Sequence, residues 1–305
     1  METNSKENGY LNIKDPKSVL NELETKIQEL FQSKDYIKFL QKMSLLHDYS
    51  FNNIILILMQ KPDASMVASF ATFNQMHRRV VKGSKAIKVL CPCPTKLKRK
   101  IETKDENGQV VFQETEENRL LFKFGNVFDI SQTVPVDEEG VFKTCFAKEL
   151  QYNSTFIQTI ISNIKKSITI PIEYDSTLNG SRNGYYKIDS KEIFIRQGMS
   201  HLQELKTLVH ELAHHYQHTN YGTLIKTLDR NDLEVSAEST AYVVLKMLSD
   251  FYGVPEIDSS DYSVGYVASW SKDKTLQELK TTLTLISKIS NDLFKVISTA
   301  IPQVM

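Results

Sequence analysis

The sequence contains few cysteines, one tryptophan and no excess charge of either sign. Three cysteines are too few, and odd in number, for a disulfide framework, and this usage is typical of the reducing cytoplasm. The formal net charge is +0, so the whole-chain balance says nothing about an acidic partner. The sequence has no run of about 18 apolar residues, and its polar N-terminus has no apolar signal core. We therefore expect a cytoplasmic protein without a membrane segment.

The composition is typical of a globular protein of two domains. A hydrophobic content of 41% and a charged content of 24% are usual for soluble domains, and 305 residues are enough for two of them. Proline, glycine and a cluster of acids interrupt the hydrophobic pattern over Val134–Gly140. We interpret this segment as a linker. We predict an α+β protein in which this linker joins an N-terminal domain of mixed α and β structure, residues 15–135, to a second domain, residues 142–305.

Hydrophobic periodicity predicts the elements of both domains. Apolar residues at helical spacing predict helices over 16–43, 50–60, with Ser50 as N-cap, and 69–77 in the first domain. Strands are predicted there over 86–90, 110–113 and 120–124, with a hairpin turn over 105–108. The second domain is predicted to contain helices over 146–162 and 275–299 and strands over 168–174, 185–189 and 192–196.

Two of the cysteines lie in Cys91-Pro-Cys-Pro94, a spacing that could form half of a metal site. A second pair is missing, because only Cys145 remains. We interpret Cys91 and Cys93 as reduced thiols at the end of a strand that the prolines interrupt.

The segment His210-Glu-Leu-Ala-His214 has the H-E-x-x-H spacing of zinc hydrolases. Its histidines lie four residues apart in a stretch of helical periodicity, which puts both imidazoles on one helix face about 6 Å apart along the axis. Two such imidazoles can bind one Zn²⁺, and Glu211 can act on a water molecule as a general base. An ordinary surface helix also carries Glu and His, but the apolar body of this helix and an acid downstream favour a zinc site.

The third ligand is expected from two acids that are again four residues apart, Glu234 and Glu238. A catalytic zinc ion usually has three protein ligands and one open position. We predict Glu234 as the ligand and Glu238 as a residue that hydrogen-bonds a ligand imidazole and fixes its tautomer. The same spacing allows the reverse assignment. His215 and His218 lie off this geometry, and we interpret them as surface or substrate-facing residues.

The sequence contains a basic segment although its net charge is zero. From Met76 to Lys100 the sequence has nine Lys or Arg residues and no acid, and aromatic residues flank this stretch. Cations combined with stacking rings are what binding of single-stranded nucleic acid requires, although a solvated surface above core aromatics gives the same pattern. The candidate contacts are Arg78, Arg79, Lys82, Lys85, Lys88, Phe73, Tyr49 and Asn53.

Several segments resemble a known family. Those in the first domain resemble the N-terminal domain of ArdC-type antirestriction proteins; they are Tyr49–Gln60, Pro62–Ala64, Ser69–Asn74, Arg79–Leu90 and Val127–Thr133. The H-E-x-x-H and Glu234 segments resemble the metallopeptidase domain of the same proteins, which is related to the ImmA/IrrE peptidases, and Tyr266–Trp270 resembles a further family element. The resemblance covers most of residues 15–295. It implies a single-stranded-DNA-binding domain joined to a zincin-like domain, carried on plasmids, phages or conjugative elements and protecting incoming DNA against restriction.

The chain departs from the family pattern at two places. Phe73 stands where the family often has tryptophan, and a phenylalanine ring can still stack. His77-Arg78 stands where the family often has Gly-Arg, so a large side chain occupies a turn at which a glycine is common.

Three functions fit these residues. In the first, a zinc metallopeptidase acts on an unidentified peptide, with Zn²⁺ held by His210, His214 and Glu234 and with Glu211 moving the proton. In the second, the N-terminal domain binds single-stranded DNA and the zincin domain is catalytically silent. In the third, the peptidase regulates its own mobile element by cleaving a repressor. The oligomeric state stays open.

Overall fold

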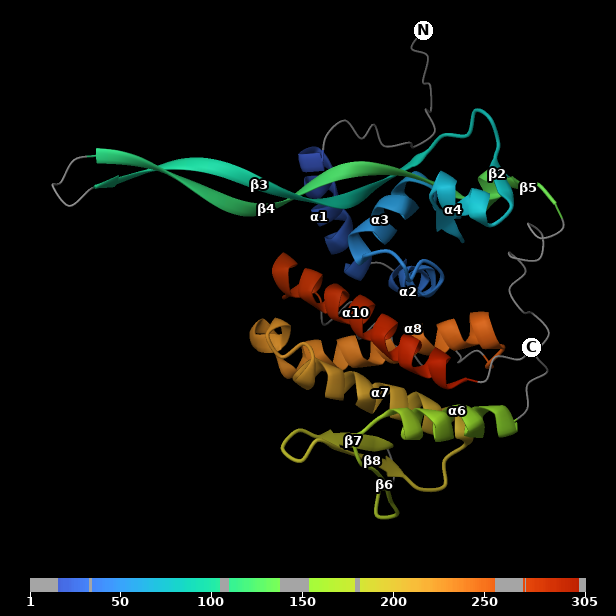
Figure 1. Cartoon of the computed structure of the whole chain (residues 1–305). Coiled ribbons are helices and arrows are strands. Elements are labelled where there is room, and N and C mark those ends of the chain that lie inside the picture. The colour runs from blue at the N-terminus through green and yellow to red at the C-terminus, as the bar shows by residue number, and fades with distance from the viewer. Residues whose placement is uncertain are drawn as a thin grey trace, which may run out of the picture.

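The computed structural model describes residues 16–32, 35–104, 110–137, 154–178, 182–255, 271 and 273–301. Figure 1 shows these elements in layers: the N-terminal helices and a long two-stranded ribbon at one end, two long C-terminal helices in the middle, and further helices with a small sheet at the other end. Helices and separate small sheets are combined, which confirms the predicted α+β class.

The N-terminal region begins with two helices where the periodicity predicts one. Helix α1 spans Pro16–Gln32 and helix α2 spans Asp35–Leu45, so the prediction of one helix over 16–43 is wrong. The reason is that the two helices pack on different partners. Helix α1 packs on α10 (Leu276–Ala300), whereas α2 packs on α8 (Arg230–Tyr252). One straight helix could not cover both surfaces.

Helix α3 spans Phe51–Gln60 and confirms the predicted helix with Ser50 as its N-cap. Two of its amide side chains, two turns apart, bind the edge of a strand. The side chain of Asn53 donates to the carbonyl of Leu90 and accepts from its N–H. Gln60 makes the same pair of bonds with Lys88. These two amides therefore take the place of a neighbouring strand along this edge.

The strands of the ribbon are much longer than predicted. Strand β3 spans Ile87–Lys104 and pairs antiparallel with β4, Val110–Asp129. The predicted strands therefore extend beyond their expected ends, and the prediction that the prolines end a strand near Cys91 and Cys93 is wrong. Pro92 and Pro94 lie at even positions, like Lys88 and Leu90, whose backbone groups point away from β4 towards α3. The missing N–H of each proline therefore faces the outer edge, and no hydrogen bond between the strands is lost. The hairpin turn predicted over 105–108 lies outside the described residues.

Short elements complete the N-terminal region. Strand β1, Val67–Ala68, pairs with the end of β4, and strand β2, Arg78–Val80, pairs with β5, Thr133–Pro135. Helix α4 spans Phe70–Gln75 between them and confirms the short helix predicted over 69–77. A 3-10 turn over Ile130–Gln132 connects β4 to β5.

The C-terminal region is a small sheet covered by helices. Strands β6 (Ile172–Asp175), β7 (Gly184–Lys187) and β8 (Glu192–Arg196) lie in the order β6-β8-β7, with β6 parallel and β7 antiparallel to β8. The predicted pairing of the strands over 185–189 and 192–196 is confirmed. The strand predicted over 168–174 begins only at Ile172, after Pro171.

Three helices of this region were also predicted from the sequence. Helix α7 spans His201–Thr219, and α10 reproduces the amphipathic helix predicted over 275–299. Helix α6, Ser154–Ser167, overlaps the helix predicted over 146–162; residues 146–153 lie outside the described part of the chain. None of the described helices is long and apolar enough to cross a membrane.

The two predicted domains share a buried core. One apolar cluster combines residues of α1, α2 and α3 with Val243 and Met247 of α8 and Leu283 of α10. Within this contact the hydroxyls of Tyr36 and Ser239 lie 2.9 Å apart and are both fully buried. A second cluster lies among α6, α7, α8, α10 and β8. Helix α8 thus touches the N-terminal helices on one side and α7 on the other.

Candidate metal centre and nucleic-acid surface

The H-E-x-x-H segment lies on α7, as predicted. Ser200 caps the helix by accepting a hydrogen bond from the backbone N–H of Gln203. Leu205, Leu208 and Leu212 are fully buried and attach the helix to the second core cluster. The apolar face therefore sets the rotation of α7 and leaves the two histidines facing α8.

Three side chains from α7 and α8 converge: His210, His214 and Glu234. The two Nε2 atoms lie 3.2 Å apart, and Oε2 of Glu234 lies 3.6 Å from Nε2 of His210 and 3.5 Å from Nε2 of His214. The side chain of Glu234 is 42% exposed, against 19% for His210 and 14% for His214, so the cluster opens to solvent beside Glu234. The three ligand atoms lie close enough to one another to hold a single metal ion.

Glu238 lies behind His210, on the side away from the cluster centre. Its Oε2 is 3.1 Å from Nδ1 of His210, and its Oε1 is 3.0 Å from Nζ of Lys206. Burial opposes the charge on both groups, but their mutual hydrogen bond and the nearby charges outweigh it. The pKa of Glu238 falls to about 2, and that of His210, which also lies near Glu234, rises to about 10. The nearby His210 and His214 likewise lower the pKa of Glu234.

Behind His214 lies a residue that the sequence analysis missed. Oε1 of Gln217 is 2.9 Å from Nδ1 of His214, and the side chain of Gln217 is fully buried. The signal was available, because residues three positions apart are neighbours on a helix surface. A glutamine does not stand out next to an H-E-x-x-H motif, however, and burial cannot be read from the spacing.

Glu211 lies beside the cluster and is only 6% exposed. Its carboxylate accepts a hydrogen bond from the backbone N–H of Tyr186 in β7. Burial is the largest influence on Glu211 and raises the pKa of its carboxyl group, while the nearby His210 and His214 oppose that rise.

Gly184 makes the close approach of β7 to α7 possible. A Cβ atom at this position would lie 2.7 Å from Cγ2 of Thr207, 2.8 Å from the carbonyl oxygen of Phe194 and 3.3 Å from Oε1 of Glu211. Each of these distances is shorter than ordinary van der Waals contact. Only a glycine therefore fits between the strand and Glu211 without displacement.

His215 and His218 lie outside the ligand cluster, as the helix geometry predicts, but they are half-buried rather than simply exposed. Nδ1 of His215 lies 3.2 Å from the hydroxyl of Tyr186, and the ring of His218 stacks on the Tyr186 ring with centroids 6.2 Å apart. Both histidines thus help to hold β7 against α7.

Two of the predicted nucleic-acid contacts belong to the interior. Phe73 has 0% exposure, so its ring cannot stack on a base, and that prediction is corrected. Arg78 is also buried: its Nε donates to Oγ1 of Thr133 at 2.8 Å, across the β2–β5 pair. The sequence pattern shows ring and charge at these positions but not the direction in which they point.

The polar groups of two further candidates are used within the fold. The hydroxyl of Tyr49 donates to the carbonyl of Val67 at 3.0 Å, and burial raises its pKa to about 12. Asn53 is held by both backbone groups of Leu90. These residues connect α3 and its N-terminal flank to the neighbouring strands instead of presenting hydrogen-bonding groups to a ligand.

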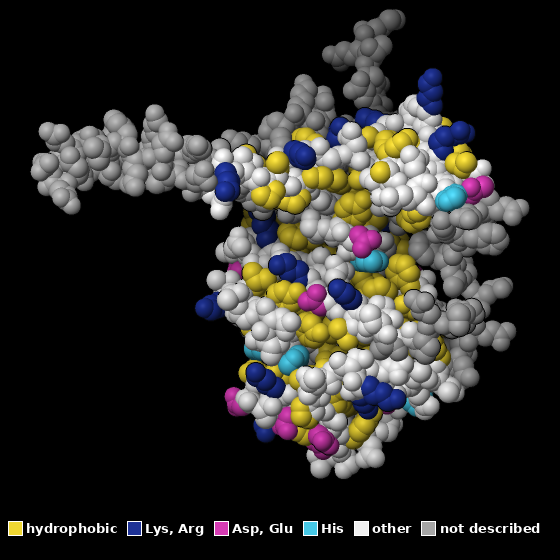
Figure 2. Space-filling view, in the orientation of Figure 1, with side chains coloured by type: hydrophobic (Ala, Val, Ile, Leu, Met, Phe, Trp, Pro, Cys, Tyr) yellow, Lys and Arg dark blue, Asp and Glu magenta, His cyan; other side chains and the backbone are white. Residues whose placement is uncertain are grey.

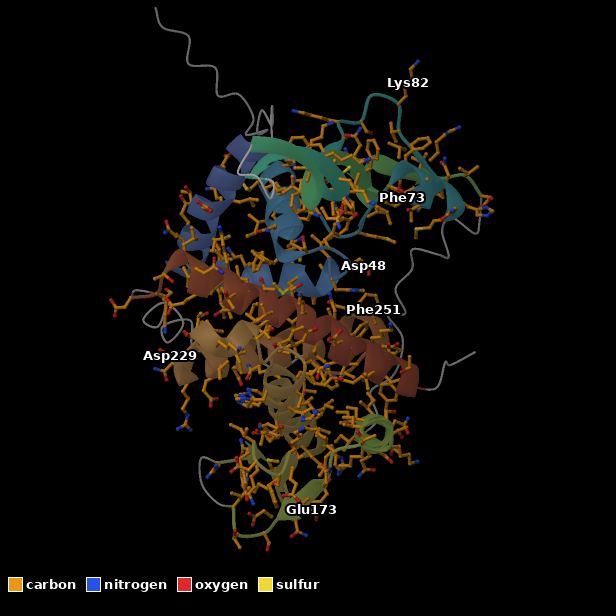
Figure 3. The ribbon with its side chains drawn as sticks, turned by 60° about the vertical axis from the view of Figure 1, so that its left-hand side comes forward. Asp48, Phe73, Lys82, Glu173, Asp229 and Phe251 are labelled. Carbon is orange, nitrogen blue, oxygen red and sulfur yellow. The ribbon has the colours of Figure 1, made fainter. Side chains whose placement is uncertain are left out.

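The remaining candidates lie on the surface next to β2 and β3. Arg79, Lys82 and Lys85 are exposed, and Lys82 extends outward from the loop between these strands (Figure 3). Lys88 is half-buried, and its Nζ donates to Oδ1 of Asn126. Lys and Arg side chains are scattered over this end of the molecule in Figure 2.

In the outer ribbon, the backbone register pairs basic positions with acidic ones. It places Lys98 opposite Glu116 and Lys100 opposite Glu114. The basic end of the segment from Met76 to Lys100 is therefore aligned with the acids that follow it in sequence.

His77 occupies a turn in the left-handed region, with φ of 55°. This conformation favours glycine, which accounts for the glycine that the family resemblance leads us to expect there. Nδ1 of His77 lies 2.6 Å from Oδ2 of Asp137.

The described residues define a class of protein: an α+β protein in which an H-E-x-x-H helix and a glutamate of the next helix form a cluster able to hold a metal ion. Residues 17–128 match the family of N-terminal domains of the anti-restriction factor ArdC. The chain therefore carries an ArdC-type N-terminal domain.

Whole-chain comparisons extend this finding to the fold. The Mn(II)-bound crystal structure of antirestriction protein ArdC from plasmid R388 superposes with a TM-score of 0.52 at 14% identity, covering 93% of this chain and 98% of that one. Its metal-free structure gives 0.48 at 18% identity, over 82% and 86%. An uncharacterized pXO2 protein of Bacillus anthracis is 28% identical over 286 residues, which are 84% of this chain. The chain spans about half of that relative, 46% of its length.

Proposed function

We propose that this protein is an antirestriction protein of the ArdC type, carried on a mobile genetic element, and that its C-terminal region is a zinc-dependent metallopeptidase. The observation that carries the enzymatic part is the convergence of His210, His214 and Glu234, with the buried Glu211 beside them. The ArdC-type domain and the ArdC-like fold support the antirestriction part.

The donor set of this cluster fits a zinc ion. Bonds of about 2.0–2.1 Å at tetrahedral angles place two ligand atoms of zinc about 3.3–3.4 Å apart. The three separations in the cluster are 3.2, 3.5 and 3.6 Å. Two imidazoles and one carboxylate are also the ligand types of catalytic zinc sites that keep one position open. When bound, such a cation polarises a carbonyl group and makes water a better nucleophile near neutral pH.

Glu211 is proposed to move the proton. Its pKa is raised by burial, which suits a carboxylate that takes a proton from water and passes it to a leaving amine. The N–H of Tyr186 holds this carboxylate against β7. The absence of a side chain at Gly184 leaves room for the close approach. Because the Tyr186 N–H fixes this carboxylate, its position needs little reorganisation during the reaction.

The neighbouring strand supports a peptide as substrate. Strand β7 lies at the edge of the described three-stranded sheet. Its alternate backbone groups point away from β8, and among them the N–H of Tyr186 reaches Glu211. An extended peptide can bind along such an edge by main-chain hydrogen bonds, which would bring it next to the carboxylate.

The test uses zinc analysis and cleavage of a quenched fluorescent peptide library by the wild type and Glu211→Gln. We expect the variant to keep zinc and to lose about 10²–10⁴-fold in cleavage rate, the usual contribution of a general base. Glu204→Gln is the matched control, because Glu204 lies on the same helix but contacts Tyr174 instead of the cluster. Wild-type rates in Glu211→Gln would remove Glu211 from the mechanism. Zinc binding without cleavage by the wild type would favour a catalytically silent zincin region.

We further propose that the N-terminal region binds single-stranded DNA through Arg79, Lys82 and Lys85. Their exposure beside β2 and β3 and the ArdC-type domain support this proposal. Affinity for a labelled single-stranded oligonucleotide is expected to fall with salt, with a slope of about 0.7 per phosphate contact. Lys82→Ala should flatten that slope, whereas Lys187→Ala, on β7 in the C-terminal region, should not. Binding that is independent of salt would contradict the proposal.

A further inference from the structure

We propose that Gln217 is a positioning residue: it fixes His214 in the tautomer that carries hydrogen on Nδ1 and presents Nε2 to the metal cluster. The inference rests on the proposed metal site and concerns a residue that the H-E-x-x-H motif does not include. Gln217 lies one turn after His214 on α7 and is fully buried.

The amide of Gln217 has only one orientation that satisfies its neighbours. Its Nε2 lies 2.9 Å from the carbonyl oxygen of Leu233 and 2.6 Å from Oγ of Ser236. The hydroxyl of Ser236 points at the same carbonyl, 3.2 Å away, so a lone pair of Oγ is left to accept from the amide. A flipped amide would place Oε1 against the Leu233 carbonyl, with two acceptors in a buried site, which is costly.

This orientation determines what His214 can do. With both N–H groups of Gln217 directed to α8, its Oε1 faces Nδ1 of His214 at 2.9 Å and can only accept. Nδ1 must therefore carry the hydrogen, and in the neutral imidazole Nε2 keeps its lone pair. That lone pair points to the position shared with His210 and Glu234.

The same hydrogen bonds connect α7 and α8, the two helices that carry the proposed metal ligands. Leu233 directly precedes Glu234, so the amide of Gln217 connects the ligand of α7 to the turn of α8 that carries the third ligand. The two histidines are thus supported differently. His210 faces the carboxylate of Glu238, which also contacts Lys206, whereas His214 faces a neutral amide. Support of this kind sets both the tautomer and the orientation of a metal-binding imidazole.

The experiment compares Gln217→Met with the wild type, because methionine has a similar length and its sulfur is only a weak acceptor for the imidazole N–H. Zinc affinity is measured by competition with a chromophoric chelator, and the His214 tautomer by ¹⁵N NMR of the imidazoles in the metal-free protein. We expect a 10–100-fold loss of affinity, about the usual effect of removing such a partner. We also expect the hydrogen of His214 to move towards Nε2, because Glu234 is then its remaining acceptor, 3.5 Å away.

Two further variants separate positioning from a structural role. Ser236→Ala removes one acceptor of the amide but leaves the Leu233 carbonyl, so its affinity loss should be smaller. Gln217→Glu keeps an acceptor for His214 and should keep the Nδ1–H tautomer, so a shift of the hydrogen to Nε2 in this variant would contradict the inference even if Gln217→Met does not fold. An unchanged tautomer in Gln217→Met, or equal affinity losses in Gln217→Met and Ser236→Ala, would overturn the inference. A wild type that binds no zinc would instead overturn the proposed function, and the tautomer measurement would still report on Gln217.

Discussion

Replacing Gly184 by alanine tests how closely β7 is held against Glu211. The added Cβ would lie 2.7 Å from Cγ2 of Thr207, whereas two carbon atoms in contact are about 3.5–4.0 Å apart. The strand must therefore move by about 1 Å, and overpacking of this kind costs about 1–3 kcal/mol of stability. Gly184 is not among the described glycines with positive φ, so backbone strain adds nothing to this value. A displacement of about 1 Å at a reacting group can lower a rate by about 100-fold.

Three measurements are needed for Gly184→Ala: unfolding by urea in the metal-free protein, zinc affinity, and peptide cleavage. We expect lower stability and much slower cleavage but nearly unchanged zinc affinity, because the three ligands lie on α7 and α8. Adding Thr207→Ser removes the Cγ2 methyl group but keeps the hydroxyl that donates to the carbonyl of Gln203, and should restore part of both losses. If Gly184→Ala matches the wild type in stability and cleavage, β7 does not lie against α7 as described.

The remaining predictions concern the supports of the site and of the N-terminal region. In the metal-free protein, the raised pKa of His210 stabilises the fold fully below pH 6.5, the ordinary pKa of histidine, and this contribution is lost as pH rises through about 10. The lowered pKa of Glu238 stabilises the fold fully above pH 4.5, and this contribution is lost as pH falls through about 2. Urea unfolding should therefore show the largest contribution of this pair between pH 4.5 and 6.5, and His210→Ala should flatten that profile. Asn53→Leu leaves both backbone groups of Leu90 unpaired and should lower the free energy of unfolding by about 1–3 kcal/mol for each group that stays buried. The control Asn52→Leu should lower it less, and equal losses of stability in the two variants would contradict the role of the Asn53 amide. Arg78→Ala should lower stability without changing the salt dependence of DNA binding, and a flatter salt slope would show that Arg78 reaches the phosphates after all.

The residues of the candidate site could be predicted because they follow helical spacing. His210 with His214, and Glu234 with Glu238, are pairs four residues apart, and the structure turns both pairs towards each other. The predicted order, Glu234 in the cluster and Glu238 behind His210, is the one that the distances display. The role of Gln217 could not be predicted from spacing, because it depends on the hydrogen bonds that its buried amide makes with α8.

The N-terminal region shows what spacing alone does not reveal. Pro92 and Pro94 suggested the end of a strand, but their positions on the outer edge of the ribbon depend on the register with β4. Phe73 and Arg78 suggested contacts with nucleic acid, but the packing of α4 and the β2–β5 pair turns them inward. Charge and ring patterns identify residue types, whereas burial is decided by residues far away in sequence.

Zinc content after dialysis, measured on the wild type, Glu234→Gln and Glu238→Gln, shows whether His210, His214 and Glu234 hold a metal ion. We expect about one zinc ion per chain in the wild type, loss of zinc in Glu234→Gln, and retained zinc with weaker affinity in Glu238→Gln, since removing a support of a metal-binding imidazole costs about 10–100-fold. A wild type without zinc, or loss of zinc in Glu238→Gln but not in Glu234→Gln, would contradict this ligand assignment.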